Sequence, residues 1–368
     1  MMTVSNAPTP AGTAPKDPGA AIGGSTAGGG RLSQVVRWGV LAAAAAVGLA
    51  LSLLLGDFSV LSWVVLSALV YVVAIYSVSR AVEGPRHALD RLVTGVVTTF
   101  FLLALIPLVS LLVTVLQRGT RRLDTEFFTV SMRGVVGEGG GIAHALQGTL
   151  MITLVTTLVA VPIGILAAIY LVEYGQGRRL ARSITFFVDV MTGIPSIVAG
   201  LFAFSLFSLV VEPGFKAGIV GVSALTLLMI PVVVRSTEEM LRLVPNELRE
   251  ASYALGVPKW LTVVKVVLPT AVAGIATGVT LAIARIIGET APLLVTAGIG
   301  TSLNPNLFKD PMPTLPVFAY YQITQPGVQR EAYIDRAWSA ILVLIVIVMA
   351  LNVVARLISK FFAPKTGR

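Results

Sequence analysis

Glu250-Ala251-Ser252-Tyr253-Ala254-Leu255-Gly256, followed by Leu268-Pro269, is a polar segment between two long apolar runs. Small and apolar side chains recur at helical spacing over 248–255, which predicts a short helix with a narrow, small-residue face. Gly256 and Pro258 predict its end, and a second helical piece is expected from Lys259 to near Pro269. Because helices this short are marginal in water, the segment must rest on its own bundle or in a groove of a partner.

The composition predicts an all-α membrane protein. The 368 residues are 55% hydrophobic and 12% charged, with a mean hydropathy of +0.88, so they carry more apolar surface than one soluble core would bury. Recurring apolar runs of about 20 residues match membrane-spanning helices. Cysteine is absent, and His87 and His144 are too few and too distant in sequence for a metal site. We expect no metal, no cofactor and no nucleic-acid binding.

The chain is expected to form a tail, an appended hairpin and a core. Residues 1–36 predict a disordered cytoplasmic tail without the features of a signal peptide. Residues 37–83 predict a transmembrane hairpin, and 92–360 predict a core of six helices in which 235–269 form a cytoplasmic loop. The eight expected spans lie at about 38–56, 58–79, 92–116, 145–172, 184–211, 216–235, 270–298 and 334–357.

The distribution of basic residues predicts the orientation. With eight spans, one side of the membrane holds 18 of the 27 Lys and Arg residues, and the side with the excess is the cytoplasm. Both termini and the polar insert are therefore expected to be cytoplasmic. The loop 117–144 opposes this assignment, because it places four arginines outside, partly balanced by acidic residues: Arg118, Arg121, Arg122 and Arg133.

Two charged residues, Arg285 and Glu289, lie within the seventh expected span. A charge at mid-membrane costs roughly 2.5–3.5 kcal/mol, so such residues tend to be functional. Their spacing of four predicts a shared helix face and an ion pair. The pair either fixes helix packing or forms an anion gate, in which the arginine fork binds oxyanion oxygens. Gly278 and Ala282 would extend this face as a strip that lines a path or admits a neighbouring helix.

The fifth expected span contains helix-breaking residues. Gly193, Pro195 and Ser196 predict a kink that could shape a translocation pathway. Asp189 in the same span is left open, since it could lie at a hydrated interface. The proline-rich segment 299–333 predicts a stiff outer loop that either docks a soluble protein or has no partner.

The polar insert resembles the EAA loop of ABC importer permeases. Glu250, Ala251 and Gly256, with the distant Leu268-Pro269, match that motif, whereas Ser252 replaces its second alanine. The resemblance implies a coupling helix that sits in a groove of an ATPase subunit. The chain itself has no G-x-x-x-x-G-K-[ST] loop for nucleotide phosphates, so the ATPase is expected to be a separate chain and this one a transporter subunit rather than an enzyme.

The string 282–294, together with the insert, resembles phosphate-specific ABC importer permeases of the PstA type over residues 92–360. This resemblance implies a type I ABC importer core in the plasma (inner) membrane that forms half of a phosphate pathway, with Arg285 and Glu289 involved in phosphate passage. The implied partners are a homologous permease of the PstC type, a PstB-type ATPase dimer and an extracytoplasmic PstS-type phosphate-binding protein.

Three other functions remain open. An ABC permease for another oxyanion, such as sulfate or molybdate, would share the coupling loop but not the full string 285–294. A proton-driven secondary transporter would use Glu289 as its proton carrier and would need no docking insert. A membrane scaffold that reports phosphate status to a signalling protein is compatible with transport.

Overall fold

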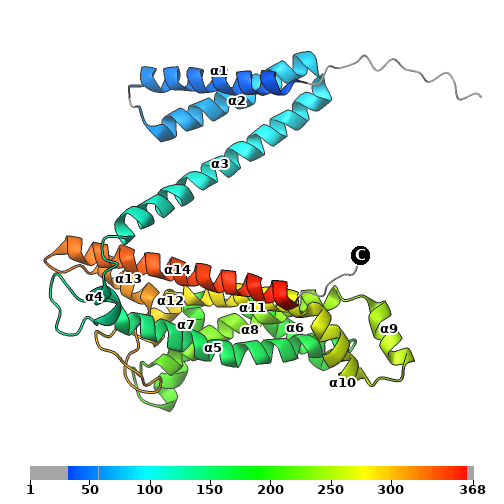
Figure 1. The fold of residues 1–368 in the computed structure, drawn as a ribbon, viewed down its shortest axis with the longest axis vertical. Helices are drawn as coiled ribbons and strands as arrows, with labels where there is room; N and C mark the ends of the chain where they lie inside the picture. The colour runs from blue at the N-terminus through cyan, green and yellow to red at the C-terminus, as the bar shows by residue number, and fades with distance from the viewer. Residues whose placement is uncertain (1–31, 57, 363–368) are drawn as a thin grey trace, which may run out of the picture. The chain divides into compact units, whose positions relative to one another are not determined.

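The computed structural model describes residues 32–56 and 58–362, and every regular element in these ranges is a helix. The predicted tail therefore lies almost wholly outside the described residues. The chain divides into two compact units, residues 1–110 and 111–368. Figure 1 shows the helices of each unit.

The first unit contains the expected hairpin. Helices α1 (Gln34–Leu54) and α2 (Val60–Val82) pack along each other, and α3 (Pro85–Gly119) begins in this unit. Gly48 lies so close to Ser67 that a Cβ atom there would collide with the Ser67 backbone, which is how small residues bring membrane helices together. Ser59 and Ser62 form a capping box that starts α2. The two packed helices of the expected hairpin are present, and their separate standing as an appended transmembrane hairpin stays a prediction.

A buried carboxylate joins the ends of this hairpin. Glu83 follows α2, and its side chain accepts hydrogen bonds from the Leu32 N–H, the Ser79 hydroxyl and the Arg91 guanidinium. The guanidinium beside it holds the pKa of the Glu83 carboxyl well below its usual range. These bonds fix the start of α1, the end of α2 and the first turns of α3 to one another.

The second unit is a bundle built around α8. Its elements are α4 (Thr125–Thr129), α5 (Ala143–Ile169), η1 (Tyr170–Tyr174), α6 (Arg179–Thr192), α7 (Ser196–Val210), α8 (Gly218–Arg242), α9 (Asn246–Ala254), α10 (Lys259–Thr262), η2 (Val263–Val267), α11 (Leu268–Ile287), α12 (Ala291–Thr296), α13 (Leu315–Thr324) and α14 (Arg330–Phe362). Helix α8 packs against both α5 and α11, and α11 packs against α14. Figure 1 shows α9 and α10 at one end of this unit and α4 and α13 at the other.

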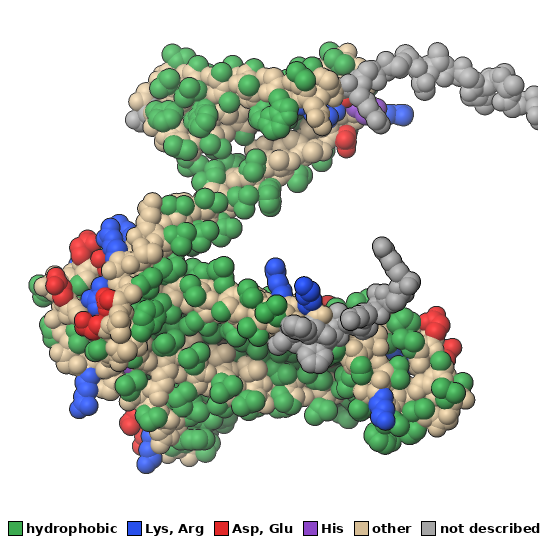
Figure 2. Space-filling model, viewed as in Figure 1, with side chains coloured by type: hydrophobic (Ala, Val, Ile, Leu, Met, Phe, Trp, Pro, Cys, Tyr) green, Lys and Arg blue, Asp and Glu red, His purple; other side chains and the backbone are tan. Residues whose placement is uncertain are grey.

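Glycines let the central helices approach closely. A Cβ atom at Gly278 of α11 would lie 2.6 Å from the Ser236 Cβ of α8, and one at Gly164 of α5 would lie 2.8 Å from the Val233 Cβ. The strip that includes Gly278 and Ala282 therefore admits a neighbouring helix and does not line an open path. On the visible face of this unit, hydrophobic side chains cover the middle and charged ones gather toward the ends (Figure 2), as expected for a bundle surrounded by lipid.

The fifth expected span is broken rather than straight. Helices α6 and α7 meet at an angle of 107°, at the Gly193-Ile194-Pro195 segment. Near the start of α6, Arg182 lies with Arg242 around one hollow, whereas Ala203 of α7 packs near Val220. The pair thus follows α8 along most of its length, so we count it as one span. With it, the described residues hold the eight expected spans, against seven unbroken ones.

The seventh expected span begins earlier and ends earlier than predicted. Its helix runs without interruption from Lys259 to Ile287, so the prediction of a separate piece ending near Pro269 is wrong. The π-helical turn η2 explains this, because the Leu268 N–H bonds to the Val263 carbonyl in a widened turn that accommodates the following proline. The helix stops at Gly288, whose carbonyl would meet the Pro292 ring in a continuous helix.

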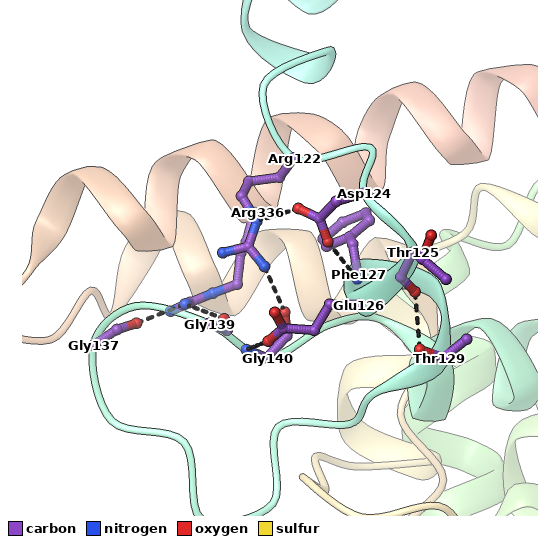
Figure 3. Close-up of polar contacts among 10 residues, drawn as sticks. All are labelled: Arg122, Asp124, Thr125, Glu126, Phe127, Thr129, Gly137, Gly139, Gly140 and Arg336. Atoms are coloured by element: carbon purple, nitrogen blue, oxygen red, sulfur yellow. Dashed lines mark hydrogen bonds and ion pairs between the residues drawn. The ribbon is translucent and has the colours of Figure 1, made fainter.

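The arginine-rich loop between α3 and α5 is held in place by buried hydrogen bonds (Figure 3). Arg336 of α14 is fully buried and donates to the carbonyl oxygens of Gly137 at 2.6 Å and Gly139 at 2.9 Å. Arg122 pairs with Asp124 at 3.1 Å and donates to the Gly140 carbonyl. This loop is therefore a folded cap and not an unstructured connection.

Two of the four arginines that opposed the predicted orientation are neutralised by carboxylates. Arg121 pairs with Asp335 at 3.2 Å, and Arg122 pairs with Asp124.

The segment 299–333 also differs from the expected surface loop, because it contains α13, whose Leu315 and Phe318 are buried against α5 and α14. The many prolines of this segment predicted an irregular loop, so the sequence pattern did not reveal the packed helix α13.

Candidate functional site

The polar insert forms a two-helix knob at one end of the second unit. Helix α9 spans Asn246–Ala254, Gly256 has a φ of +75°, and Pro258 precedes α10. The predicted short helix and its left-handed end are confirmed. Glu250, Ala251 and Gly256 are all exposed.

Ser252, the departure from the motif, has a structural role. It is buried, and its hydroxyl lies 2.8 Å from the Thr262 hydroxyl. This hydrogen bond joins α9 to α10 across the turn. An alanine at this position has no hydroxyl and could not form it. Much of the knob's outer surface is uncovered, with Leu255 83% and Trp260 61% exposed. Large exposed apolar side chains on a polar helical insert indicate a docking surface.

Arg285 lies near the middle of the bundle. Gly274 faces Met240 and Gly278 faces Ser236, so α11 and α8 run antiparallel. The same register, continued, places Arg285 level with Met229, close to the midpoint of α8. Ala282 and Ile286, on either side of Arg285, pack in one core cluster with Met229, which agrees with this level.

The Arg285 side chain is on the uncovered face of α11. Thr277, Leu281 and Arg285 follow one another at helical spacing and are all exposed, whereas Ile275, Ala282 and Ile286 are buried. In the described part of the chain, no carboxylate forms an ion pair with Arg285. An always-charged group at this level needs an anion, water or another chain beside it.

Glu289 is not on that helix face. Helix α11 ends at Ile287, and Glu289 lies in the break before α12, partly exposed. No hydrogen bond or ion pair between its side chain and Arg285 occurs among the residues the structure describes. The expected pairing is therefore wrong for this conformation, because Gly288 and Pro292 end the helix between the two residues.

The structure contains an ion-pair network that sequence reasoning missed. Arg235 of α8 pairs with Asp189 of α6 and, at 2.8 Å, with Glu238, which also pairs with Arg242 at 2.5 Å. Asp189, left open from the sequence, is thus a partner of α8. The Arg-x-x-Glu-x-x-x-Arg spacing over 235–242 was the available signal, since such residues share one helix face. The contact with Asp189 needed the three-dimensional structure.

The predicted kink residues lie at the break between α6 and α7. Gly193 caps the C-terminus of α6, Pro195 precedes α7, and Ser196 is the first residue of α7. The kink itself is confirmed. A part for these three residues in a translocation pathway stays a prediction. In the described residues, no three His, Cys, Asp or Glu side chains come together in a way that could hold a metal ion.

Comparisons with known proteins define the class. Residues 160–368 match the family model described as binding-protein-dependent transport system inner membrane component. A solved bacterial alginate ABC transporter in complex with a pentasaccharide-bound periplasmic protein has a similar fold, with a TM-score of 0.51 and 16% identity over 74% of this chain and 96% of that one. Bundle and insert are thus those of an ABC importer permease subunit, a multi-pass inner-membrane protein.

Two relatives narrow the assignment. The phosphate transport system permease protein PstA 1 of Mycobacterium tuberculosis is 49% identical over 299 residues, which cover 79% of this chain and 95% of that protein. The PstA protein of Yersinia pestis is 37% identical over 78% of this chain and 94% of its own length. The chain belongs to the binding-protein-dependent transport system inner membrane components and, among them, to the PstA family of phosphate transport system permeases.

Proposed function

We propose that this chain forms half of the translocation pathway of an ATP-driven importer of inorganic phosphate. The observation that carries the proposal is that the second unit has two separate uncovered surfaces. The knob around α9 is exposed and carries large apolar side chains, and Arg285 is exposed at mid-bundle with no ion pair among the described residues. A second chain is needed to cover each of them.

The partners we propose are those that membership of the PstA family implies, and each fits an uncovered surface or an end of the second unit. A homologous PstC-type permease would cover the face of α11 that carries Arg285 and complete the pathway. A PstB-type ATPase dimer would bind the α9 knob through Glu250, Ala251 and Gly256. A PstS-type binding protein would deliver phosphate at the end that carries α4 and α13. This arrangement requires both termini to be cytoplasmic.

Phosphate would pass beside Arg285. A guanidinium offers a planar fork of donors that matches two oxyanion oxygens, and at mid-bundle it would be only weakly screened by water. Glu289, in the break between α11 and α12, would lie along the same pathway without pairing with Arg285. The break at Gly193, Pro195 and Ser196 would let α6 and α7 move separately. We further propose that 92–360 form the transport core and 37–83 an appended hairpin.

Uptake into proteoliposomes tests this function. The reconstituted complex contains both permeases, the ATPase and the binding protein. It should take up labelled phosphate only when ATP is present on the side of the membrane where the ATPase is bound. Sulfate and molybdate should be taken up at a small fraction of that rate, because binding-protein selection and the pathway both discriminate. Phosphate uptake driven by a proton gradient without ATP would instead identify a secondary transporter, and faster sulfate or molybdate uptake would identify another oxyanion permease.

A further inference from the structure

Arg249 of α9 turns away from the exposed face of the knob. Its side chain is 13% exposed, and it pairs with Glu173 of η1, which is 5% exposed, at 2.8 Å. The same guanidinium donates to the carbonyl oxygens of Leu241 at 2.9 Å and Val244 at 2.6 Å. One side chain therefore contacts η1 at the end of α5, the end of α8, and, through the Asn246 side chain at 3.3 Å, its own helix.

These contacts satisfy groups that would otherwise be costly to bury. The last carbonyls of a helix have no N–H partner further along the helix, and Arg249 donates to one of them, the Leu241 carbonyl of α8, and to the Val244 carbonyl just beyond the helix end. The Glu173 carboxylate is buried and accepts two hydrogen bonds from Arg249. The Arg249–Glu173 pair therefore holds α9 and η1 in one geometry. Removing either residue would leave the other as a buried charge without a partner.

A second cationic contact lies beside the first. The Lys259 ammonium, at the start of α10, lies 5.1 Å from the centre of the Tyr174 ring. Both helices of the knob are thus attached to η1, which carries Glu173 and Tyr174. Since η1 is a π-helical turn, where a helix departs from regular hydrogen bonding, the end of α5 is also a natural point of bending.

We infer that Arg249 is the positioning residue that fastens the coupling helix to the ends of α5 and α8, so that a displacement of α9 by the ATPase moves both helices together. The inference rests on the proposed function, since it concerns how ATP hydrolysis is coupled to phosphate movement. Arg249 acts through Glu173 and two carbonyls and touches neither phosphate nor nucleotide. Glu250, by contrast, belongs to the surface that meets the ATPase.

Coupling in the complete reconstituted complex tests this role. For Arg249→Gln, the ATPase should still co-purify and ATP hydrolysis should stay within about twofold of wild type, while phosphate transported per ATP should fall about tenfold. Glu173→Gln keeps the carbonyl contacts and should lower the same ratio by about threefold. The control is Arg179→Gln, which removes an exposed arginine whose side chain has no hydrogen bond or ion pair in the described structure, and it should leave the ratio unchanged.

The double variant separates a specific link from general damage. If Arg249 and Glu173 act as one link, Glu173→Gln/Arg249→Gln should lose no more coupling than Arg249→Gln alone. The chain has no cysteine, so cysteines placed at 173 and 249 can be joined by a short bis-maleimide, which should restore the ratio. If the Arg249→Gln complex does not assemble, the phosphate transported per ATP by Glu173→Gln and by the cross-linked cysteine pair tests the inference instead.

A normal ratio in Arg249→Gln and Glu173→Gln would overturn the inference while leaving the proposed function intact. Independent, additive losses in the double variant would also overturn it. Absence of ATP-dependent phosphate uptake in the wild-type complex, by contrast, would contradict the proposed function itself.

Discussion

Replacing Arg285 with alanine is expected to lower ATP-dependent phosphate uptake about 100-fold in a complex that still assembles. Arg285 lies level with the midpoint of α8 and is exposed on α11 without an acidic partner in the described residues. Loss of a weakly screened charge that contacts an oxyanion costs several kcal/mol, whereas the helix loses no packing on that face. Initial uptake rates in proteoliposomes, at matched protein content, measure the effect.

Two further variants define what Arg285 contributes. Leu281→Met is the control on the same face, since Leu281 lies one turn away and is 66% exposed, and methionine keeps its apolar volume, so uptake should stay near normal. Arg285→Lys keeps the charge but loses the planar fork, so we expect an intermediate loss of about tenfold. Normal uptake in Arg285→Ala would show that this arginine only packs against a neighbouring chain.

Glu250→Lys is expected to weaken binding of the ATPase by at least about tenfold without affecting membrane insertion. The residue is exposed on α9, so the substitution reverses a charge on the docking surface and disturbs no buried contact of the knob. Charge reversal at an interface replaces a complementary contact with a repulsive one. Co-purification of the ATPase with tagged permease, over a range of salt concentrations, measures the loss.

The same charge reversal away from the knob provides the comparison. Glu239 is exposed near the end of α8 and forms no ion pair in the described structure, and Glu239→Lys should co-purify the ATPase as wild type does. Equal retention of the ATPase by the Glu250 and Glu239 variants would mean that α9 does not form the docking surface.

Local patterns predicted the parts of this protein that depend on local chemistry. Apolar runs gave the spans, and Gly256 with Pro258 gave the end of α9, because span length and left-handed backbone are properties of short segments. The kink near Pro195 followed for the same reason. None of these features needs information about which helices are neighbours.

Features that depend on helix register were not predictable. The apolar run 270–298 predicted one continuous helix with Arg285 and Glu289 on the same face. In the structure α11 ends at Ile287, between these two residues, because Gly288 and Pro292 interrupt the helix. The Asp189–Arg235 and Glu173–Arg249 pairs join residues 46 and 76 positions apart. Such contacts follow from how α6, η1 and α9 pack against α8, and nothing in a single sequence identifies them.

The most direct test of the account is the accessibility of the α9 knob. Because the chain has no cysteine, Leu255→Cys creates one label site at a position that is 83% exposed. A membrane-impermeant maleimide should leave this cysteine unmodified in intact cells, label it in inside-out vesicles stripped of the ATPase, and fail to label it once the ATPase is added back. Labelling in intact cells, or labelling that the ATPase does not prevent, would contradict a cytoplasmic coupling helix.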